Sequence, residues 1–233
     1  MEILIFDHME EATEAEVQRM LPLVSTQRRE QAMRYKHVFG QFCCLKSWMM
    51  LKEIMDNGQW TMDNGEGRMD NGQWTMDNGE WRLDNGQWTM DDGEGTMDNG
   101  QWTMDNWSYN EYGKPFFTPS PLHSFTPYFS ISHCKEGIAV AIDDQPIGID
   151  IEGIRHADEE LIARTMNEGE RLRIKDLGIR EFTRLWTQKE AIVKAEGVGI
   201  MSFEQLQTIL DNGQWTLDTF EKEKYIYSVA YQL

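Results

Sequence analysis

A tandem seven-residue repeat constrains this chain more than any other feature of its sequence. Seven consecutive units run from Asp56 to Met104, most of them reading DNGQWTM, and an isolated unit, DNGQWTL, occupies residues 211–217. A coiled coil also has a period of seven, but it needs apolar residues at two positions of a helix. Each unit here carries Asn-Gly or Asp-Gly, which is a poor helix centre, so the block does not predict a coiled coil.

The repeat instead predicts β-hairpins, because Asn-Gly favours two-residue turns between antiparallel strands. Five residues, Q-W-T-M-D, remain between successive turns, and in a strand the Trp and Met share one face. A two-residue turn then places each Met opposite the next Trp. The block thus predicts a β-meander, which Gly67 and Gly95 weaken by replacing Trp, and a floppy polar insert remains the alternative.

Much of the acidity of the chain also lies in the repeat. The formal net charge is −18, and the block holds eleven acids against two bases, so half of that charge lies there. A chain this acidic has no electrostatic reason to bind nucleic acid or an anionic membrane surface. A local basic pocket for a phosphorylated ligand remains compatible with the composition.

Two further features indicate a reduced cytoplasmic compartment. The N-terminal apolar run is only a few residues long and is followed at once by acids, so it predicts neither a signal peptide nor a spanning helix. The three cysteines, Cys43, Cys44 and Cys134, have no spacing typical of a zinc site or a disulfide framework.

Outside the repeat, helical and strand patterns alternate without a regular βαβ order, which predicts an α+β fold. Strands are expected at residues 2–7, near 109–117, and at 128–133, 137–143, 146–152 and 225–233. Helices are expected at 10–21, 25–55 and 158–197, with Ser25 as an N-cap.

Two motifs carry acids at informative spacings. On a strand, Asp150 and Glu152 share one face, about 7 Å apart, and carboxylates so placed suit Mg²⁺, although an ordinary solvated strand face is the alternative. On a helix, Glu190 and Lys194 lie one turn apart, where the acid can bind a metal or take a proton and the lysine can neutralise phosphate. A surface ion pair is the alternative there.

Three weaker motifs offer groups for an anion. His133 follows Ser132 on a predicted strand and faces the opposite way, so it is a candidate phosphate ligand or a hydrogen-bonded residue at the edge of the core. Lys114 and Pro115 form a stiff turn with a cation, which is not a P-loop because the Gly-x4-Gly-Lys spacing is absent. Arg28 opens a basic cluster that either holds nucleotide phosphates or balances nearby acids; its other members are Arg29, Arg34, Lys36 and His37.

The order of these motifs is more specific than any one of them. GKP, F-x-I-S-H, QPIGIDIE-x-x-R and W-T-x-K-E-A-x-x-K-x-x-G-x-G follow one another along the chain. This series resembles the 4′-phosphopantetheinyl transferases of the type that activates surfactin synthetase. The resemblance extends over residues 22–55 and 107–233 and leaves out the repeat.

The resemblance implies two similar α+β lobes with coenzyme A bound between them. Residues 1–55 and 107–127 are then the N-terminal lobe, 56–106 the insert, and 128–233 the C-terminal lobe with the metal site. The implied activity is the Mg²⁺-dependent transfer of phosphopantetheine from coenzyme A to a serine of an apo acyl or peptidyl carrier protein. We expect a cytoplasmic monomer with no nucleic-acid or membrane partner.

The resemblance also implies residue roles. Asp150, Glu152 and Glu190 match the metal-binding acids, Glu190 matches the base, and Lys194 matches the lysine that stabilises the pyrophosphate. The implied coenzyme A contacts are Arg28, Lys114, Pro115, Ser132 and His133. Gln41 stands about where many relatives carry an arginine for the nucleotide, which predicts weaker nucleotide binding unless the basic cluster compensates. The alternative function is a binding protein that uses the Trp/Met sheet on a disabled transferase scaffold.

Overall fold

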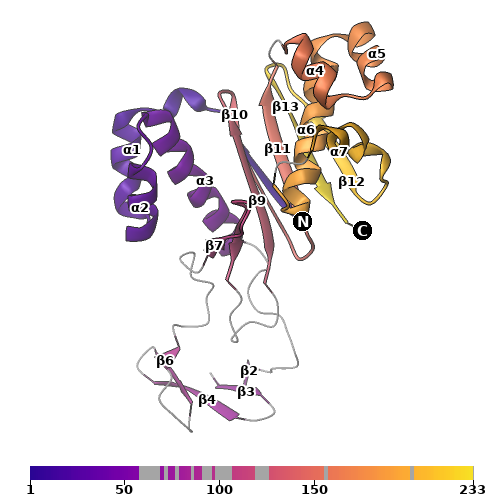
Figure 1. Cartoon of the computed structure of the whole chain (residues 1–233). Helices are drawn as coiled ribbons and strands as arrows, with labels where there is room; N and C mark the ends of the chain where they lie inside the picture. Colours follow the sequence, from indigo (N-terminus) through magenta and orange to yellow (C-terminus); the bar gives the residue numbers. More distant parts are fainter. Residues whose placement is uncertain are drawn as a thin grey trace.

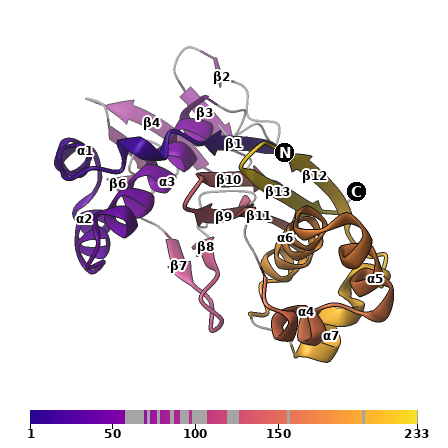
Figure 2. The same ribbon diagram turned by 90° about the horizontal axis from the view of Figure 1, so that it is seen from above.

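The computed structural model of the chain describes residues 1–57, 107–118, 126–154, 157–199 and 202–232, and five short strands within the repeat. Outside the repeat, two three-stranded antiparallel sheets stand between two groups of helices (Figures 1 and 2). The expected mixture of helices and sheets is therefore confirmed. No helix among the described residues is long and apolar enough to cross a membrane.

The first sheet has the strand order β1-β10-β9 and carries helices on its outer face. Its strands are β1 (Glu2–Phe6), β9 (Tyr128–Cys134) and β10 (Gly137–Asp143). Alternate β10 residues, among them Val140, pack against α1 (Glu14–Met20), α2 (Thr26–Met33) and α3 (Val38–Asn57). The residues between them, Ala139 and Ala141, face the second sheet.

The second sheet has the order β11-β13-β12 and packs under a long helix. Its strands are β11 (Ile147–Gly153), β12 (Thr216–Glu221) and β13 (Tyr225–Tyr231), and the helix is α6 (Ile179–Glu196). The isoleucines of β11 enter the cluster between the sheets. This alternation leaves Gly148, Asp150 and Glu152 for the other face, as the sequence predicts.

Serine side chains join the two sheets where edge strands β9 and β11 meet. Ser130 Oγ accepts the backbone N–H of Ile149 at 3.0 Å, and Ser132 Oγ accepts that of Ile151 at 3.3 Å. Each hydroxyl satisfies a buried donor at a free strand edge, where an unpaired N–H would be costly.

Shorter helices surround the N-terminal half of α6. They are α4 (Glu159–Thr165), α5 (Glu168–Leu177) and α7 (Phe203–Thr208), and short 3₁₀ turns lie at Met9–Glu11, Leu21–Leu23 and Ile209–Asp211. The buried Lys189 of α6 joins them, because its ammonium donates to Glu170 Oε2 at 2.9 Å, Thr165 O at 3.1 Å and Leu206 O at 2.5 Å.

Two expected helices are interrupted. The span 25–55 contains α2 and α3 separated by residues 34–37, although Ser25 does cap α2 by accepting the N–H of Arg28. The span 158–197 contains α4, α5 and α6, because Asn167 starts a new helix through a capping box and Gly178, at φ 82°, separates α5 from α6. Local caps therefore override a continuous helical pattern.

The sheets also divide the chain differently from the expected boundary at 127/128. Strands β9 and β10, which lie in the expected C-terminal lobe, pair with β1 at the N-terminus. The change from one sheet to the other falls between Asp143 and Ile147.

Five short strands within the repeat pair in sequence order. They are β2 (Met69–Asp70), β3 (Gln73–Met76), β4 (Gly79–Asp84), β5 (Gln87–Met90) and β6 (Thr96–Met97). The register places Met69 opposite Trp74 and Leu83 opposite Trp88, as expected for an Asn-Gly turn of two residues. It places Trp74 opposite Trp81, which differs from the expected pairing of Met with the next Trp. The expected Trp/Met face concerns side chains that lie outside the described residues.

The isolated unit at 211–217 has a defined place in the second sheet. Trp215 and Leu217 both pack against the apolar cluster of α6, and Trp215 Nε1 donates to Glu196 Oε1 at 3.3 Å. The unit leads into β12, a strand that the sequence pattern did not predict.

Candidate active site

Asp150 lies at the centre of a polar contact between β9, β11 and α6. Its carboxylate is buried, with 4% of the residue exposed. Oδ1 accepts hydrogen bonds from Ser132 Oγ at 2.8 Å and from Lys194 Nζ at 2.6 Å. Oδ2 is buried as well and has no hydrogen-bond partner. A carboxylate oxygen left unpaired in this way is costly unless it receives a cation or a donor.

A glycine brings the helix close enough for this contact. A Cβ added to Gly148 would lie 2.0 Å from Ala191 O and 2.4 Å from Ala195 N, so no larger residue fits between β11 and α6. The close approach presents Lys194 and, one turn earlier, Glu190 to the β11 face that carries Asp150.

The charge of Glu190 is coupled to the other acids of this face. Its pKa is raised to about 6, chiefly by burial and also by the negative charges of Asp150 and Glu152, while Lys194 lowers it. The electrostatic coupling places the three acids in one neighbourhood. Among the described residues, however, no group of three or more histidines, cysteines or acids is close enough to form a ready metal cluster.

Carboxylate oxygens are the ligands that Mg²⁺ prefers, so these residues suit the ion chemically. The buried, unpartnered Oδ2 of Asp150 is the strongest single indication, since a divalent ion would satisfy it. A divalent ion would also relieve the mutual repulsion that raises the pKa of Glu190. Lys194 is the cation that contacts Asp150 in this structure.

The predicted anion ligands do not lie together. Ser132 belongs to the Asp150 contact, whereas His133 faces α3 and lies 6.4 Å, between ring centroids, from Phe39. Loss of hydration lowers the pKa of His133, and the positive charge of Lys194 lowers it further, which connects the ring electrostatically to the site.

Lys114 lies at the C-terminal end of α6. Its ammonium donates to Ala195 O at 3.0 Å and to Ile147 O at 3.4 Å, and burial lowers its pKa to about 8. Pro115 follows at the start of β8 (Pro115–Phe117), which pairs with β7 (Trp107–Tyr109). The lysine is therefore next to the helix that carries Glu190 and Lys194.

Comparison with known proteins relates most of this site to one family. The family model described as the 4′-phosphopantetheinyl transferase superfamily matches residues 146–232. This segment is therefore similar to that superfamily. It contains Asp150, Glu152, Glu190 and Lys194.

Named relatives of the superfamily resemble the same part of the chain. The 4′-phosphopantetheinyl transferase gsp of Aneurinibacillus migulanus is 37% identical over 95 residues, which cover 39% of this chain and 38% of that protein. The 4′-phosphopantetheinyl transferase Sfp of Bacillus subtilis is 36% identical over 97 residues, covering 40% and 42%. The chain therefore spans about two fifths of the length of these two relatives.

A third relative aligns over a longer stretch. The 4′-phosphopantetheinyl transferase AcpT of Salmonella typhi is 35% identical over 123 residues, which cover 48% of this chain and 62% of that protein. Arg28, Lys114, Ser132 and His133 lie before the segment matched by the superfamily model, so that match does not cover them.

Arg28 lies in the helical layer of the first sheet. The residue is 5% exposed, its guanidinium lies 4.2 Å from the ring centroid of Trp107, and its Nη1 donates to Gln31 and to Cys44. Burial lowers its pKa, and its Nε has no hydrogen-bond partner. Gln41, expected to weaken nucleotide binding, donates to Tyr35 O at 2.9 Å in the same layer.

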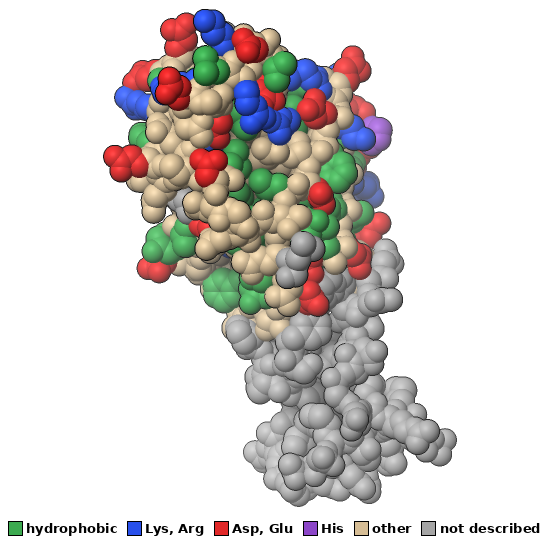
Figure 3. Space-filling view, turned by 90° about the vertical axis from the view of Figure 1, so that its right-hand side faces the viewer, with side chains coloured by type: hydrophobic (Ala, Val, Ile, Leu, Met, Phe, Trp, Pro, Cys, Tyr) green, Lys and Arg blue, Asp and Glu red, His purple; other side chains and the backbone are tan. Residues whose placement is uncertain are grey.

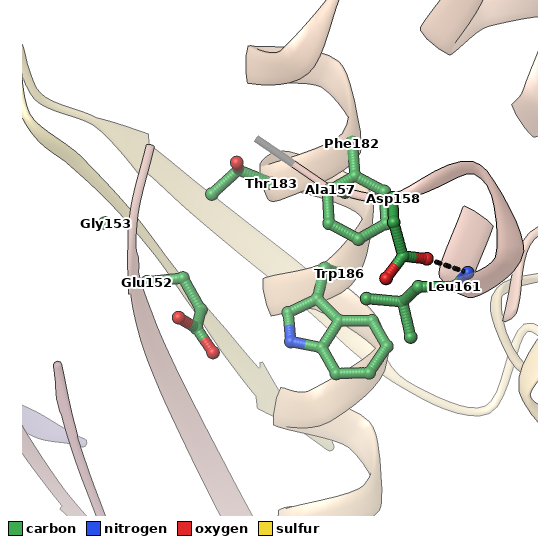
Figure 4. Close-up of a pocket in the computed structure, with 8 residues that line it drawn as sticks. All are labelled: Glu152, Gly153, Ala157, Asp158, Leu161, Phe182, Thr183 and Trp186. Atoms are coloured by element: carbon green, nitrogen blue, oxygen red, sulfur yellow. Dashed lines mark hydrogen bonds between the residues drawn. The ribbon is translucent and has the colours of Figure 1, made fainter. Parts of the chain in front are cut away.

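A cavity of about 240 Å³ opens beside Glu152 in the superfamily segment (Figure 4). Its walls come from the end of β11, the start of α4 and the N-terminal half of α6; they comprise Glu152, Gly153, Ala157, Asp158, Leu161, Phe182, Thr183 and Trp186. The ring of Trp186 stacks on Phe182 at an interplanar angle of 19°. The cavity therefore combines an acid with a mostly apolar wall next to the acids of the site.

Residues that the sequence analysis missed hold the site together. Lys189 is the first lysine of the W-T-x-K-E motif, to which the sequence analysis gave no role, and it points into the core, where it donates to Glu170. Asn110 uses its side chain to join the turn at Lys114 to Gly197 at the end of α6, donating to Gly197 O at 2.7 Å and accepting the N–H of Lys114. A turn asparagine next to GKP was the available signal.

The surface around these elements is not uniformly acidic. Figure 3 shows basic and acidic side chains interspersed over one face of the molecule. The net charge of −18 therefore does not prevent a polyanionic ligand from meeting local cations.

Proposed function

We propose that this chain transfers 4′-phosphopantetheine from coenzyme A to a serine of an apo acyl or peptidyl carrier protein, with Mg²⁺ as cofactor. The observation that carries the proposal is the Asp150–Lys194 contact between β11 and α6, inside the segment that matches the superfamily. The charges of three acids and a lysine from these two elements are coupled there, and such charges can stabilise the cleavage of a pyrophosphate.

The proposed reaction exchanges the phosphoanhydride bond of the coenzyme A pyrophosphate for a phosphate ester bond to the carrier serine. The carrier serine oxygen forms a bond to the phosphorus of phosphopantetheine, and the bond from that phosphorus to the pyrophosphate oxygen breaks. Adenosine 3′,5′-bisphosphate leaves. Bound Mg²⁺ would neutralise pyrophosphate charge, and Asp150, Glu152 and Glu190 would hold it.

The protein side chains have separate tasks in this proposal. Glu190 takes the proton of the serine hydroxyl, and its pKa of about 6 leaves it ionised at neutral pH. The ammonium of Lys194 moves from Asp150 toward the leaving phosphate and neutralises its charge. In the proposal, Lys114 and His133, which lie next to the same elements, contact the phosphates of coenzyme A.

Arg28 and Pro115 have less direct tasks in the proposal. Arg28 supports the part of the site that would bind the nucleotide. It does so from the helical layer, where Trp107 and Cys44 contact its guanidinium. Pro115 stiffens the turn that carries Lys114.

We further propose two lobes with coenzyme A between them, a repeat insert without a part in the chemistry, and a cytoplasmic monomer. The product other than the modified carrier gives a direct test. Purified protein is incubated with coenzyme A, Mg²⁺ and an apo carrier, and adenosine 3′,5′-bisphosphate is quantified by chromatography. The proposal predicts release only when apo carrier is present, and equal release without carrier or none with any carrier overturns it.

A further inference from the structure

Ser132 has every hydrogen-bonding position of its hydroxyl occupied by the protein. Oγ accepts from Ile151 N at 3.3 Å and from Lys194 Nζ at 2.8 Å. Both partners are donors, so the single hydroxyl hydrogen must point to Asp150 Oδ1, which lies 2.8 Å away. Ser132 is 6% exposed, so water does not replace these partners.

This saturated hydroxyl fixes the orientation of the Asp150 carboxylate. Oδ1 receives two donors, Ser132 and Lys194, while Oδ2 receives none. Because the two oxygens of a carboxylate are equivalent, a half-turn would restore the same arrangement, and the two donors therefore fix the plane of the carboxylate with one oxygen unpartnered. The carboxylate therefore presents one defined oxygen for a cation.

We propose that Ser132 is a positioning residue that orients Asp150, with Oδ2 directed to the divalent ion. The inference rests on the proposed metal role of Asp150. Hydrogen bonds to a metal-binding carboxylate fix its geometry, and their loss typically weakens metal binding about 10-fold or more.

The chain supplies a matched control two residues earlier. Ser130 is on the same strand and is equally buried, and its Oγ accepts the N–H of Ile149 at 3.0 Å, as Ser132 Oγ does for Ile151. Ser132 Oγ differs in that it also contacts Asp150 and Lys194. The variants Ser130→Ala and Ser132→Ala therefore both leave one β11 N–H without its acceptor, and only Ser132→Ala disturbs the carboxylate.

The test measures Mn²⁺ binding by electron paramagnetic resonance, which reports free Mn²⁺ without any turnover. The full chain is titrated with Mn²⁺ in the presence and absence of coenzyme A, with Asp150→Asn as the reference for loss of the site. We expect Ser132→Ala to weaken binding about 10-fold. We expect Ser130→Ala to bind as the wild type does, and Ser132→Thr, which keeps the hydroxyl, to restore binding.

Thermal unfolding of each variant separates positioning from stability. Equal losses of Mn²⁺ affinity in both alanine variants, no loss in Ser132→Ala, or a wild type that binds no Mn²⁺ in either condition overturns the proposal. Transfer to the carrier is measured separately. If the wild type transfers phosphopantetheine but Ser132→Ala binds Mn²⁺ as the wild type does, only the positioning role is refuted. A normal Mn²⁺ pattern without transfer to any carrier refutes only the proposed function.

Discussion

Lys194 Nζ lies 2.6 Å from Asp150 Oδ1 and so joins the last part of α6 to the middle of β11. The lysine is 28% exposed at its side chain and the aspartate 5%, so the pair spans the boundary between core and solvent. A buried carboxylate needs such a partner, whereas the more exposed ammonium can move toward an incoming phosphate. The same contact thus serves the folded protein and the proposed chemistry.

Glu190 provides a prediction about pH. Its pKa is raised from 4.5 to about 6, so the folded protein binds this proton more tightly than the unfolded chain. Protonation of Glu190 therefore contributes to the free energy of unfolding in full below pH 4.5, and this contribution is lost as the pH rises through 6. With metal removed by chelation, Glu190→Gln should raise the free energy of unfolding at pH 7.5 by about 1 kcal/mol, after allowance for solvent screening.

Urea unfolding at pH 7.5 and pH 4 measures this effect, with the exposed Glu204→Gln as control. The stabilisation should disappear at pH 4. A Glu190→Gln protein that is less stable than the wild type at pH 7.5 would contradict the assignment of burial as the cause. The same variant should lack transferase activity, because its amide cannot take the serine proton.

Lys189 predicts a large loss of stability. Replacing it by Met leaves the buried Glu170 carboxylate without its cation and two carbonyls without a donor, which should cost about 3–5 kcal/mol. Lys52→Met is the control, because its pair with Asp56 is an exposed i,i+4 contact and should matter by less than about 0.5 kcal/mol. Equal effects of the two substitutions on chemical denaturation would disprove the role of Lys189.

Gly148 tests the close approach of α6 to β11. Gly148→Ala should destabilise the fold by about 3 kcal/mol, since its Cβ would overlap backbone atoms of α6 that cannot move independently. The control is Gly169→Ala, where the nearest atom would be Asn167 Oδ1 at 3.5 Å and a helical glycine is replaced by a better helix former. A Gly148→Ala protein with wild-type denaturation and Mn²⁺ binding would rule out this packing constraint.

The repeat predicts that a large deletion is tolerated. Residues 58–106 lie between the end of α3 and the start of β7, so a short Gly-Ser linker can replace them. Loop length has only a weak effect on stability, and the proposed site lies on β9, β11 and α6. We expect the deletion variant to unfold at the same temperature and to transfer phosphopantetheine at an unchanged rate. A folded, soluble deletion variant without activity would assign the repeat a part in the reaction.

The sequence predicted local structure better than it predicted contacts. Short runs rich in strand-forming residues were sufficient to predict β9, β10 and β11, and Ser25 was correctly predicted as an N-cap. Strand β12 was missed because Trp215 and Leu217 read as one more repeat unit, and only packing on α6 distinguishes them.

The site shows the same limit. Helical and strand spacing predicted that Glu190 and Lys194 share a face and that Asp150 and Glu152 share another. Nothing in the sequence shows that the hydroxyl of Ser132 donates a hydrogen bond to Asp150, because the two residues come together only where the edges of the two sheets meet. The sequence of the basic cluster likewise did not indicate that the guanidinium of Arg28 is buried.

The intact mass of an apo carrier protein tests the central claim most directly. Several apo carriers, from fatty-acid, polyketide and peptide pathways, are incubated with coenzyme A, Mg²⁺ and either the wild type or Asp150→Asn. The proposed function predicts that at least one carrier gains the mass of a single phosphopantetheine group with the wild type and gains nothing with the variant. A folded wild-type protein that modifies none of the carriers, or an Asp150→Asn protein that modifies them equally, would contradict it.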